Sequence, residues 1–218
     1  MKPLRILIAD DHDVVREGVR TLLSQQNGWE ICGEAAGGRE AVEKALRLKP
    51  DVVVLDFSLP EMNGLDVTRR IRTALPQTEV LILTMHESEA LAAELLAAGA
   101  RAFVVKTQTR RQIIPALEAL ARHQPFFTPA VSALVLEKFL YPAPRGVREA
   151  AAGERLTARE REIVQNIAEG RTSKEIASLL GVSVKTVDAH RANILRKLRV
   201  HSVSQLVLYA IRNHLIQA

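Results

Sequence analysis

The chain has 218 residues, of which 47% are apolar, 25% are charged and 4% are aromatic, so it can bury a substantial core and is neither disordered nor collagen-like. We expect no membrane-spanning helix, because the longest stretch without a charged side chain, residues 123–136, is too short and contains two prolines. The net charge of +5 divides into −1 over residues 1–140 and +6 over residues 141–218, which indicates a second half that binds nucleic acid or merely has a solvated basic surface.

The N-terminus has no pattern of a secretion signal. The apolar run after Met1-Lys2-Pro3 stops within a few residues, at Asp10-Asp11, so it is too short for the apolar region of a signal peptide. We therefore expect a cytoplasmic protein. The single cysteine, Cys32, lies in an apolar stretch, where we expect a small core residue and neither a disulfide nor a cysteine-based zinc site.

The first 122 residues alternate short aliphatic runs with longer amphipathic segments. Such runs are typical of strands buried on both faces, and the segments between them have helical spacing. Five consecutive βα units predict an α/β fold with a parallel, doubly wound, flavodoxin-like sheet, whose ligands bind at the carboxyl ends of the strands. The predicted strands are Leu4–Ala9, Trp29–Ala36, Val52–Leu55, Val80–Thr84 and Ala102–Val105.

Polar side chains follow or end four of these strands: Asp10, Asp11, Asp56, Thr84 and Lys106. Three converging carboxylates repel one another unless a cation lies among them, and oxygen ligands in this number suit Mg²⁺. Metal, lysine and hydroxyl together suit a phosphoryl group, and an aspartate can itself be the nucleophile that forms an aspartyl phosphate. Taken singly, the acids could be helix or loop caps and the lysine a surface residue, but their joint placement at successive strand ends argues against this.

These residues lie in the segments VVVLDFSLPEMNG, LILTMH and FVVKT and, with the Asp pair, resemble the receiver domain of bacterial two-component response regulators over residues 4 to about 122. The resemblance implies that Asp56 accepts phosphate from a sensor histidine kinase. It also implies that Asp11, Asp56 and the backbone carbonyl of Ser58 hold Mg²⁺, with Asp10 assisting through water.

The same resemblance implies a conformational switch. Thr84 and Lys106 would report phosphorylation, and Phe103 would turn inward with the Thr84 hydroxyl. Tyrosine is common at the Phe103 position, so the phenol hydroxyl is absent here, and a plain core phenylalanine is the alternative. Ser58 and His86 would border the attacking water and tune the lifetime of the phosphoryl group.

A domain boundary is predicted in the middle of the chain. Residues Pro125–Leu140 have the pattern of an apolar helix that begins at a proline, and the following YPAPRGVREAAAGE, residues 141–154, has the composition of an exposed linker. We expect a receiver domain over residues 1–122, a helix and linker over residues 123–155, and an all-helical domain over residues 156–218.

The basic part of the chain has the pattern of a helix-turn-helix. A short helix, the turn Gly181-Val182-Ser183 and a third helix over Val184–Leu198 predict that this third helix enters the major groove of DNA. A three-helix bundle with a solvated cationic surface, or a protein-binding module, is the alternative. The predicted caps are Thr157 with Glu160, Thr172 with Glu175, Ser202 with Gln205, and Ser183.

The stretches LTAREREI and SKEIASLLGVSVKTVDAHRANILRKL and the trailing helix at residues 202–214 resemble the output domain of LuxR/NarL/FixJ regulators. The resemblance implies a four-helix domain that binds double-stranded DNA as a homodimer through its last helix. Asp188 stands where some relatives have lysine, so the target sequence does not carry over. Expected DNA contacts are Lys174, Lys185, Thr186, His190, Arg191, Asn193 and Lys197, and the expected dimer seam is Val203, Leu206, Val207 and Ala210.

These patterns together indicate a DNA-binding, phosphorylation-controlled transcription factor rather than an enzyme. One alternative is a Mg²⁺-dependent phosphohydrolase of the haloacid-dehalogenase type, but such enzymes need a second aspartate two residues after the nucleophile, where this chain has Ser58. The other alternative is a DNA-binding protein that ignores phosphate and uses its first domain only to dimerise.

Overall fold

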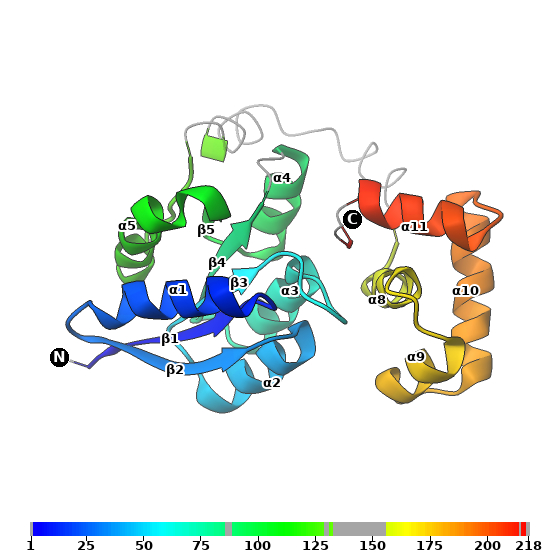
Figure 1. Ribbon diagram of the computed structural model, residues 1–218, viewed down its shortest axis with the longest axis horizontal. Helices are drawn as coiled ribbons and strands as arrows, with labels where there is room; N and C mark the ends of the chain where they lie inside the picture. The colour runs from blue at the N-terminus through cyan, green and yellow to red at the C-terminus, as the bar shows by residue number, and fades with distance from the viewer. Residues whose placement is uncertain (1, 86–88, 129–130, 133–155, 214, 217–218) are drawn as a thin grey trace. The chain divides into compact units, whose positions relative to one another are not determined.

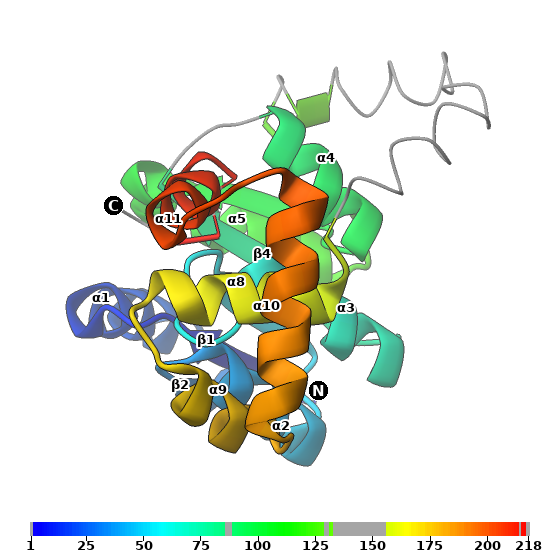
Figure 2. The same cartoon turned by 90° about the vertical axis from the view of Figure 1, so that its right-hand side faces the viewer.

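The structure, a computed structural model, describes residues 2–85, 89–128, 131–132, 156–213 and 215–216. The chain divides into two compact units, Met1–Tyr141 and Pro142–Ala218, and each is described by itself (Figures 1 and 2). Most of the predicted apolar helix after Pro125 and the whole predicted linker over 141–154 lie outside the described residues. In the described part of the chain, no helix combines the length and the apolar character needed to cross a membrane.

The first unit contains a five-stranded parallel sheet in the order β2-β1-β3-β4-β5, which confirms the predicted α/β class. All five predicted strands are present, although β2 ends one residue earlier, β3 extends to include Asp56 and β4 begins one residue earlier. Continuous aliphatic runs form these strands because both faces of the sheet are covered. The strands are β1 Leu4–Ala9, β2 Trp29–Ala35, β3 Val52–Asp56, β4 Glu79–Thr84 and β5 Ala102–Val105.

Helices cover both faces of the sheet, as Figure 1 shows. Alternate strand residues point to opposite faces, so Ile6 and Ile8 pack with α1 and α5, whereas Leu7 and Ala9 pack with α2, α3 and α4. Each fully buried Leu or Ile contributes roughly 1.5–3 kcal/mol of hydrophobic stabilisation, so the two apolar layers hold the strand ends in place. The helices are α1 Asp13–Ser24, α2 Gly38–Leu48, α3 Gly64–Ala74, α4 Glu89–Ala98 and α5 Thr109–Ala121, with a short 3₁₀ turn η1 Lys106–Gln108.

The start of the predicted apolar helix at Pro125 is wrong. After a turn at Arg122-His123 the chain runs extended instead, and Phe126 forms a parallel bridge to Ala102. The Phe126 N–H donates to the carbonyl of Arg101 at 2.9 Å, and the Phe126 carbonyl accepts from Phe103 N–H at 3.2 Å. The backbone groups of edge strand β5 need partners, and this segment supplies them.

The second unit is all helical, as predicted, with its own apolar core. The core gathers residues from every helix, among them Ile163, Ile176, Val187, Ile194 and Leu206. The helices are α8 Ala158–Ala168, α9 Ser173–Leu180, α10 Val184–Leu198 and α11 Val203–Arg212.

The helix starts in this unit are capped at the predicted residues. Thr157 and Thr172 form complete capping boxes with the glutamates three residues later. Ser183 and Ser202 each accept a backbone N–H of the first turn. The capping box predicted for Ser202 with Gln205 is formed in a different way. The Gln205 side chain accepts from the backbone N–H of His201 instead of from that of Ser202.

Candidate functional site

The carboxyl edge of the sheet brings the predicted acids and lysine together. Asp10 follows β1, Asp56 ends β3 and Lys106 follows β5, and the two aspartates are almost fully buried. The Lys106 ammonium lies 2.9 Å from Asp10 Oδ2 and 2.9 Å from Asp56 Oδ2. Asp11, which follows Asp10, keeps a third of its side chain exposed and opens the cluster to solvent.

The single buried ammonium of Lys106 is therefore shared by the two buried carboxylates of Asp10 and Asp56. Burial raises the pKa of Asp56, the Asp10 carboxylate raises it further, and the Lys106 ammonium offsets part of the rise. Burial alone would lower the pKa of Lys106, but its contacts with Asp56 and Asp10 outweigh this, and the net pKa is raised. The cluster consequently holds more negative charge than its own lysine balances.

The geometry fits a divalent cation among the carboxylates. Ligand atoms from Asp10, Asp11, His12 and Asp56 all lie within 4.8 Å of one another. Both carboxylate oxygens of Asp56 are buried, and their charge is stabilised by Lys106 and by the backbone N–H of Ser58. Such an oxygen is costly to bury unless something positive approaches it, and hard oxygen ligands suit a hard cation.

His12 is the member of this cluster that sequence reasoning missed. Its Nδ1 lies 2.8 Å from Asp11 Oδ1 and 3.4 Å from Asp10 Oδ1, and its backbone N–H donates to Asp10 Oδ1 at 2.9 Å. The signal was available in the sequence, because a histidine, itself a common metal ligand, directly follows the Asp pair.

The loop after β3 is held by close backbone approaches. Asn63 caps α3 by accepting from Asp66 N–H at 3.0 Å, and Gly64 N–H donates to the Phe57 carbonyl at 2.7 Å. A Cβ on Gly64 would lie only 2.8 Å from the Asp56 carbonyl oxygen, so glycine permits the loop to fold back. This packing fixes Ser58, which is half-buried two residues after Asp56.

The two predicted switch residues are both buried. Thr84 ends β4, and Phe103 lies inside β5 and packs in the apolar layer beneath α2, α3 and α4. In this structure the Phe103 ring is therefore a core side chain. His86, the other residue expected near the attacking water, lies outside the described residues.

The predicted DNA contacts lie on α9 and α10. Lys174, Lys185, Thr186 and Asn193 are exposed, and His190 and Arg191 are half-buried.

The Lys197 ammonium is 2.9 Å from Glu160 Oε2, so it already has an anionic partner within the domain. The Asp188 carboxylate accepts a hydrogen bond from the Ser173 hydroxyl at 2.8 Å, which links the two helices of the helix-turn-helix.

The expected dimer seam needs correction. Leu206 and Ala210 are fully buried in the core of their own domain, so they cannot also face a second copy. An amphipathic helix at the end of a small domain uses its most apolar stripe for its own core. Val203 and Leu208 are the large apolar side chains of α11 that stay exposed, at 40% and 51%, and Val207 is half-buried.

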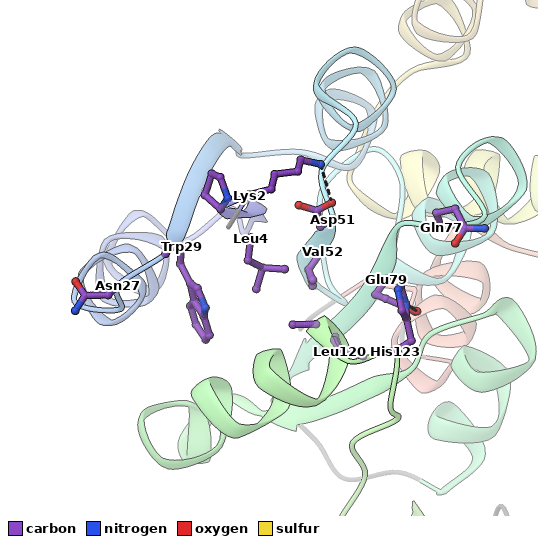
Figure 3. A pocket seen from close by; sticks show the side chains of 13 residues that line it. Lys2, Leu4, Asn27, Trp29, Asp51, Val52, Gln77, Glu79, Leu120 and His123 are labelled. Carbon is purple, nitrogen blue, oxygen red and sulfur yellow. Dashed lines mark hydrogen bonds and ion pairs between the residues drawn. The ribbon is translucent and has the colours of Figure 1, made fainter.

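The opposite, amino-terminal edge of the sheet has a different character. A cavity of about 610 Å³ opens there, with Leu4, Trp29 and Leu120 on its walls (Figure 3). Buried Glu79 is contacted by Arg72 at 3.6 Å, Arg101 at 3.7 Å and the His123 ring at 3.0 Å. None of the predicted site residues lines this cavity.

Each of the two parts of the chain matches a known protein family. Residues 6–118 match the family model of the response regulator receiver domain, and residues 154–210 match that of the bacterial regulatory proteins of the luxR family. The response regulator protein VraR of Staphylococcus aureus is 36% identical over 98% of this chain and 99% of its own length.

Solved structures are similar over almost the whole chain as well. The RcsB response regulator of Salmonella typhimurium is 27% identical, with a TM-score of 0.57 over 96% of this chain and 98% of that one. A structure of two RcsB dimers bound to two parallel DNAs is 26% identical, with a TM-score of 0.57 over 95% of this chain and 97% of that one.

Proposed function

Because the chain belongs to the two-component response regulators with a receiver domain and a LuxR-type DNA-binding domain, we propose that Asp56 is its phosphoacceptor and that a sensor histidine kinase, by phosphorylating Asp56, controls its binding to DNA and hence transcription. The observation that carries this proposal is the buried Asp10-Asp56-Lys106 cluster at the carboxyl edge of the sheet. We also propose the boundaries 1–122 for the receiver, 123–155 for a helix and linker, and 156–218 for the DNA-binding domain.

Asp56 acts as the nucleophile through Oδ1, since Oδ2 is the oxygen in contact with the Lys106 ammonium. A new O–P bond forms as the P–N bond of the kinase phosphohistidine breaks, and the leaving imidazole takes up a proton. Lys106, 2.9 Å from the other oxygen of Asp56, balances the charge that builds up on the transferred group. Thr84, at the end of the neighbouring strand, supplies the hydroxyl.

The acids would hold the cation that this chemistry needs. Asp11, Asp56 and the backbone carbonyl of Ser58 would bind Mg²⁺, with Asp10 assisting through water. The ion, when bound, neutralises the phosphoryl oxygens and the carboxylates at once. Asp10 and Asp11 would therefore position the ion, and the Lys106 ammonium, 2.9 Å from both Asp10 and Asp56, adds further positive charge.

Phosphorylation is a local charge change that must favour one arrangement of the receiver over another. Thr84 and Phe103 are the proposed switch residues: Thr84 ends β4, and Phe103 lies in the neighbouring strand β5 and packs in the apolar layer beneath α4. A few kcal/mol of differential stabilisation is enough to shift such an equilibrium.

The output domain binds double-stranded DNA through α10, and two copies bind as a homodimer. Its contacts are Lys174 on α9 and Lys185, Thr186, His190, Arg191 and Asn193 on α10, with Lys197 available only if it leaves Glu160. The seam between copies uses the exposed side of α11, with Val203, Val207 and Leu208. The protein acts in the cytoplasm, and its only catalysis is its own phosphoryl transfer and dephosphorylation.

The test is intact mass after incubation of the full chain with Mg²⁺ and acetyl phosphate. Wild type and Asp51→Asn, a half-buried acid at the opposite edge, should each gain one phosphoryl group, and Asp56→Asn should gain none. Binding to a DNA fragment selected from a random pool, at fixed salt, should tighten in parallel. If no protein gains the adduct and all bind DNA equally well, the receiver is a passive dimerisation module.

A further inference from the structure

We propose that His12 is a ligand of the cation site and that it gives this site affinity for borderline transition-metal ions, such as Ni²⁺ and Zn²⁺, in addition to Mg²⁺. The inference rests on the proposed function, in which the same carboxylates hold a cation. It adds a nitrogen donor and a second class of metal to that site.

The position of His12 is fixed by the fold. It is the residue before α1, its backbone N–H is tied to Asp10 Oδ1 at 2.9 Å, and its ring turns toward the acids. About half of the His12 side chain is exposed, at 53%, so the ring can adjust toward an ion without disturbing the core.

The distances match the edges of a coordination shell. Ligands that each lie about 2.1 Å from one ion, at right angles to each other, are about 3.0 Å apart. His12 Nδ1 lies 2.8 Å from Asp11 Oδ1 and 3.4 Å from Asp10 Oδ1, and all four ligand atoms lie within 4.8 Å of one another. Opposite ligands of such an ion are about 4.2 Å apart, slightly less than the 4.8 Å bound, so a small inward shift of the half-exposed His12 ring and of Asp11 lets one ion contact the imidazole and the carboxylates together.

The site is also short of positive charge. Asp10 and Asp56 are buried, and Lys106 is the one ammonium among the described residues that contacts both of them. An acidic cluster alone would favour hard ions, whereas imidazole nitrogen favours Ni²⁺, Cu²⁺ and Zn²⁺. The combination predicts two classes of ion that compete for one site.

Equilibrium dialysis of the full chain with Ni²⁺ as the probe tests this, counting only the Ni²⁺ that Mg²⁺ displaces. The His12→Gln variant should bind this Ni²⁺ at least about tenfold more weakly, while its Mg²⁺ affinity changes by less than about twofold. The matched control is His123→Gln, an exposed histidine at the other edge of the sheet, which should behave as wild type.

A third variant, Asp11→Asn, separates this inference from the proposed function. If it weakens Mg²⁺ binding while His12→Gln leaves Ni²⁺ binding unchanged, His12 is only a hydrogen-bond partner of Asp11, and the inference fails alone. If Asp11→Asn leaves Mg²⁺ binding unchanged, the cation site itself is misassigned, and both proposals fail.

Discussion

Replacing Lys106 by methionine would leave two buried carboxylates without the ammonium that they share. At an effective dielectric constant of about 20, each 2.9 Å contact contributes about 6 kcal/mol of attraction. The repulsion between Asp10 and Asp56, whose closest oxygens lie within 4.8 Å, is at least about 3.5 kcal/mol on the same scale. Desolvation of the ions offsets much of the attraction, and removal of one partner from a buried pair typically destabilises a protein by about 3–5 kcal/mol. We expect that loss for Lys106→Met at neutral pH.

Urea unfolding followed by tryptophan fluorescence measures this loss in the receiver alone, because Trp29 is the only tryptophan and lies in β2. With a slope of about 2 kcal/mol per molar urea, the midpoint should fall by about 1.5–2.5 M. Mg²⁺ should restore more stability to Lys106→Met than to wild type, because the ion replaces the lost positive charge.

The loss depends on pH with a definite sign. The pKa of Asp56 is already raised by burial and by Asp10, and losing Lys106 raises it further. A carboxyl whose pKa is higher in the folded state destabilises the fold increasingly as pH rises from the unfolded pKa, about 3.9, to the folded pKa. Lys106→Met should therefore approach wild-type stability near pH 4 and fall behind as pH rises to neutrality.

Two further variants decide whether the reasoning is right. Lys2→Met removes an exposed pair, 3.5 Å from Asp51, and should cost no more than about 1 kcal/mol. Adding Asp56→Asn to Lys106→Met should recover part of the loss, because only one buried acid then lacks a partner. If Lys106→Met is as stable as Lys2→Met, or if the second substitution recovers nothing, the buried charge imbalance is not what the structure implies.

Three other expectations follow from packing and charge. Leu206→Ala should destabilise the DNA-binding domain by about 2–5 kcal/mol in thermal unfolding. Leu208→Ala, at an exposed position, should change stability by less than about 0.5 kcal/mol and weaken self-association in sedimentation. If Leu208→Ala were the more destabilising variant, Leu208 and not Leu206 would lie in the core of the domain. Gly38→Ala should destabilise the receiver by about 1–3 kcal/mol, because the added Cβ would lie 2.0 Å from the Met62 carbonyl oxygen. Gly18→Ala, where the added Cβ meets no neighbouring atom, should stabilise the receiver by about 0.5–1 kcal/mol. Equal effects of the two variants in urea unfolding would contradict this. Arg191→Ala should reduce the slope of the logarithm of the DNA-binding constant against the logarithm of salt concentration by about 1. Arg47→Ala on α2 should leave this slope unchanged. An unchanged slope for both variants would mean that Arg191 does not contact a phosphate.

The elements were predictable where one physical signal dominates. Strands buried on both faces, such as Val52–Asp56, need continuous aliphatic runs, and few other structures produce them. Capping hydroxyls such as Thr157 and Thr172 mark helix starts to the residue, since the missing backbone partners occur only there. The convergence of Asp10, Asp56 and Lys106 followed from parallel strand order alone.

The parts that sequence reasoning missed depend on tertiary competition. The segment at Phe126 has helical composition but pairs with β5, because the edge of a sheet offers hydrogen bonds that the sequence does not display. Leu206 and Ala210 lie on an apolar stripe that suits either a core or an interface, and only the packed domain decides between them. The ring of His12 could equally have turned to solvent, and its distance to Asp11 comes from the folded loop.

The two edges of the sheet bury acidic side chains under opposite electrostatic conditions. At the amino edge the buried carboxylate of Glu79 is surrounded by two guanidinium groups and an imidazole, and half-buried Asp51 is paired with Lys2, so a further cation would meet repulsion there. At the carboxyl edge two buried carboxylates and a third beside them face one ammonium and the His12 imidazole, so three acids outnumber the basic groups and the same cation is attracted. The difference in charge balance alone therefore directs a divalent ion to the carboxyl edge of the domain, whatever the geometry of the ligands there.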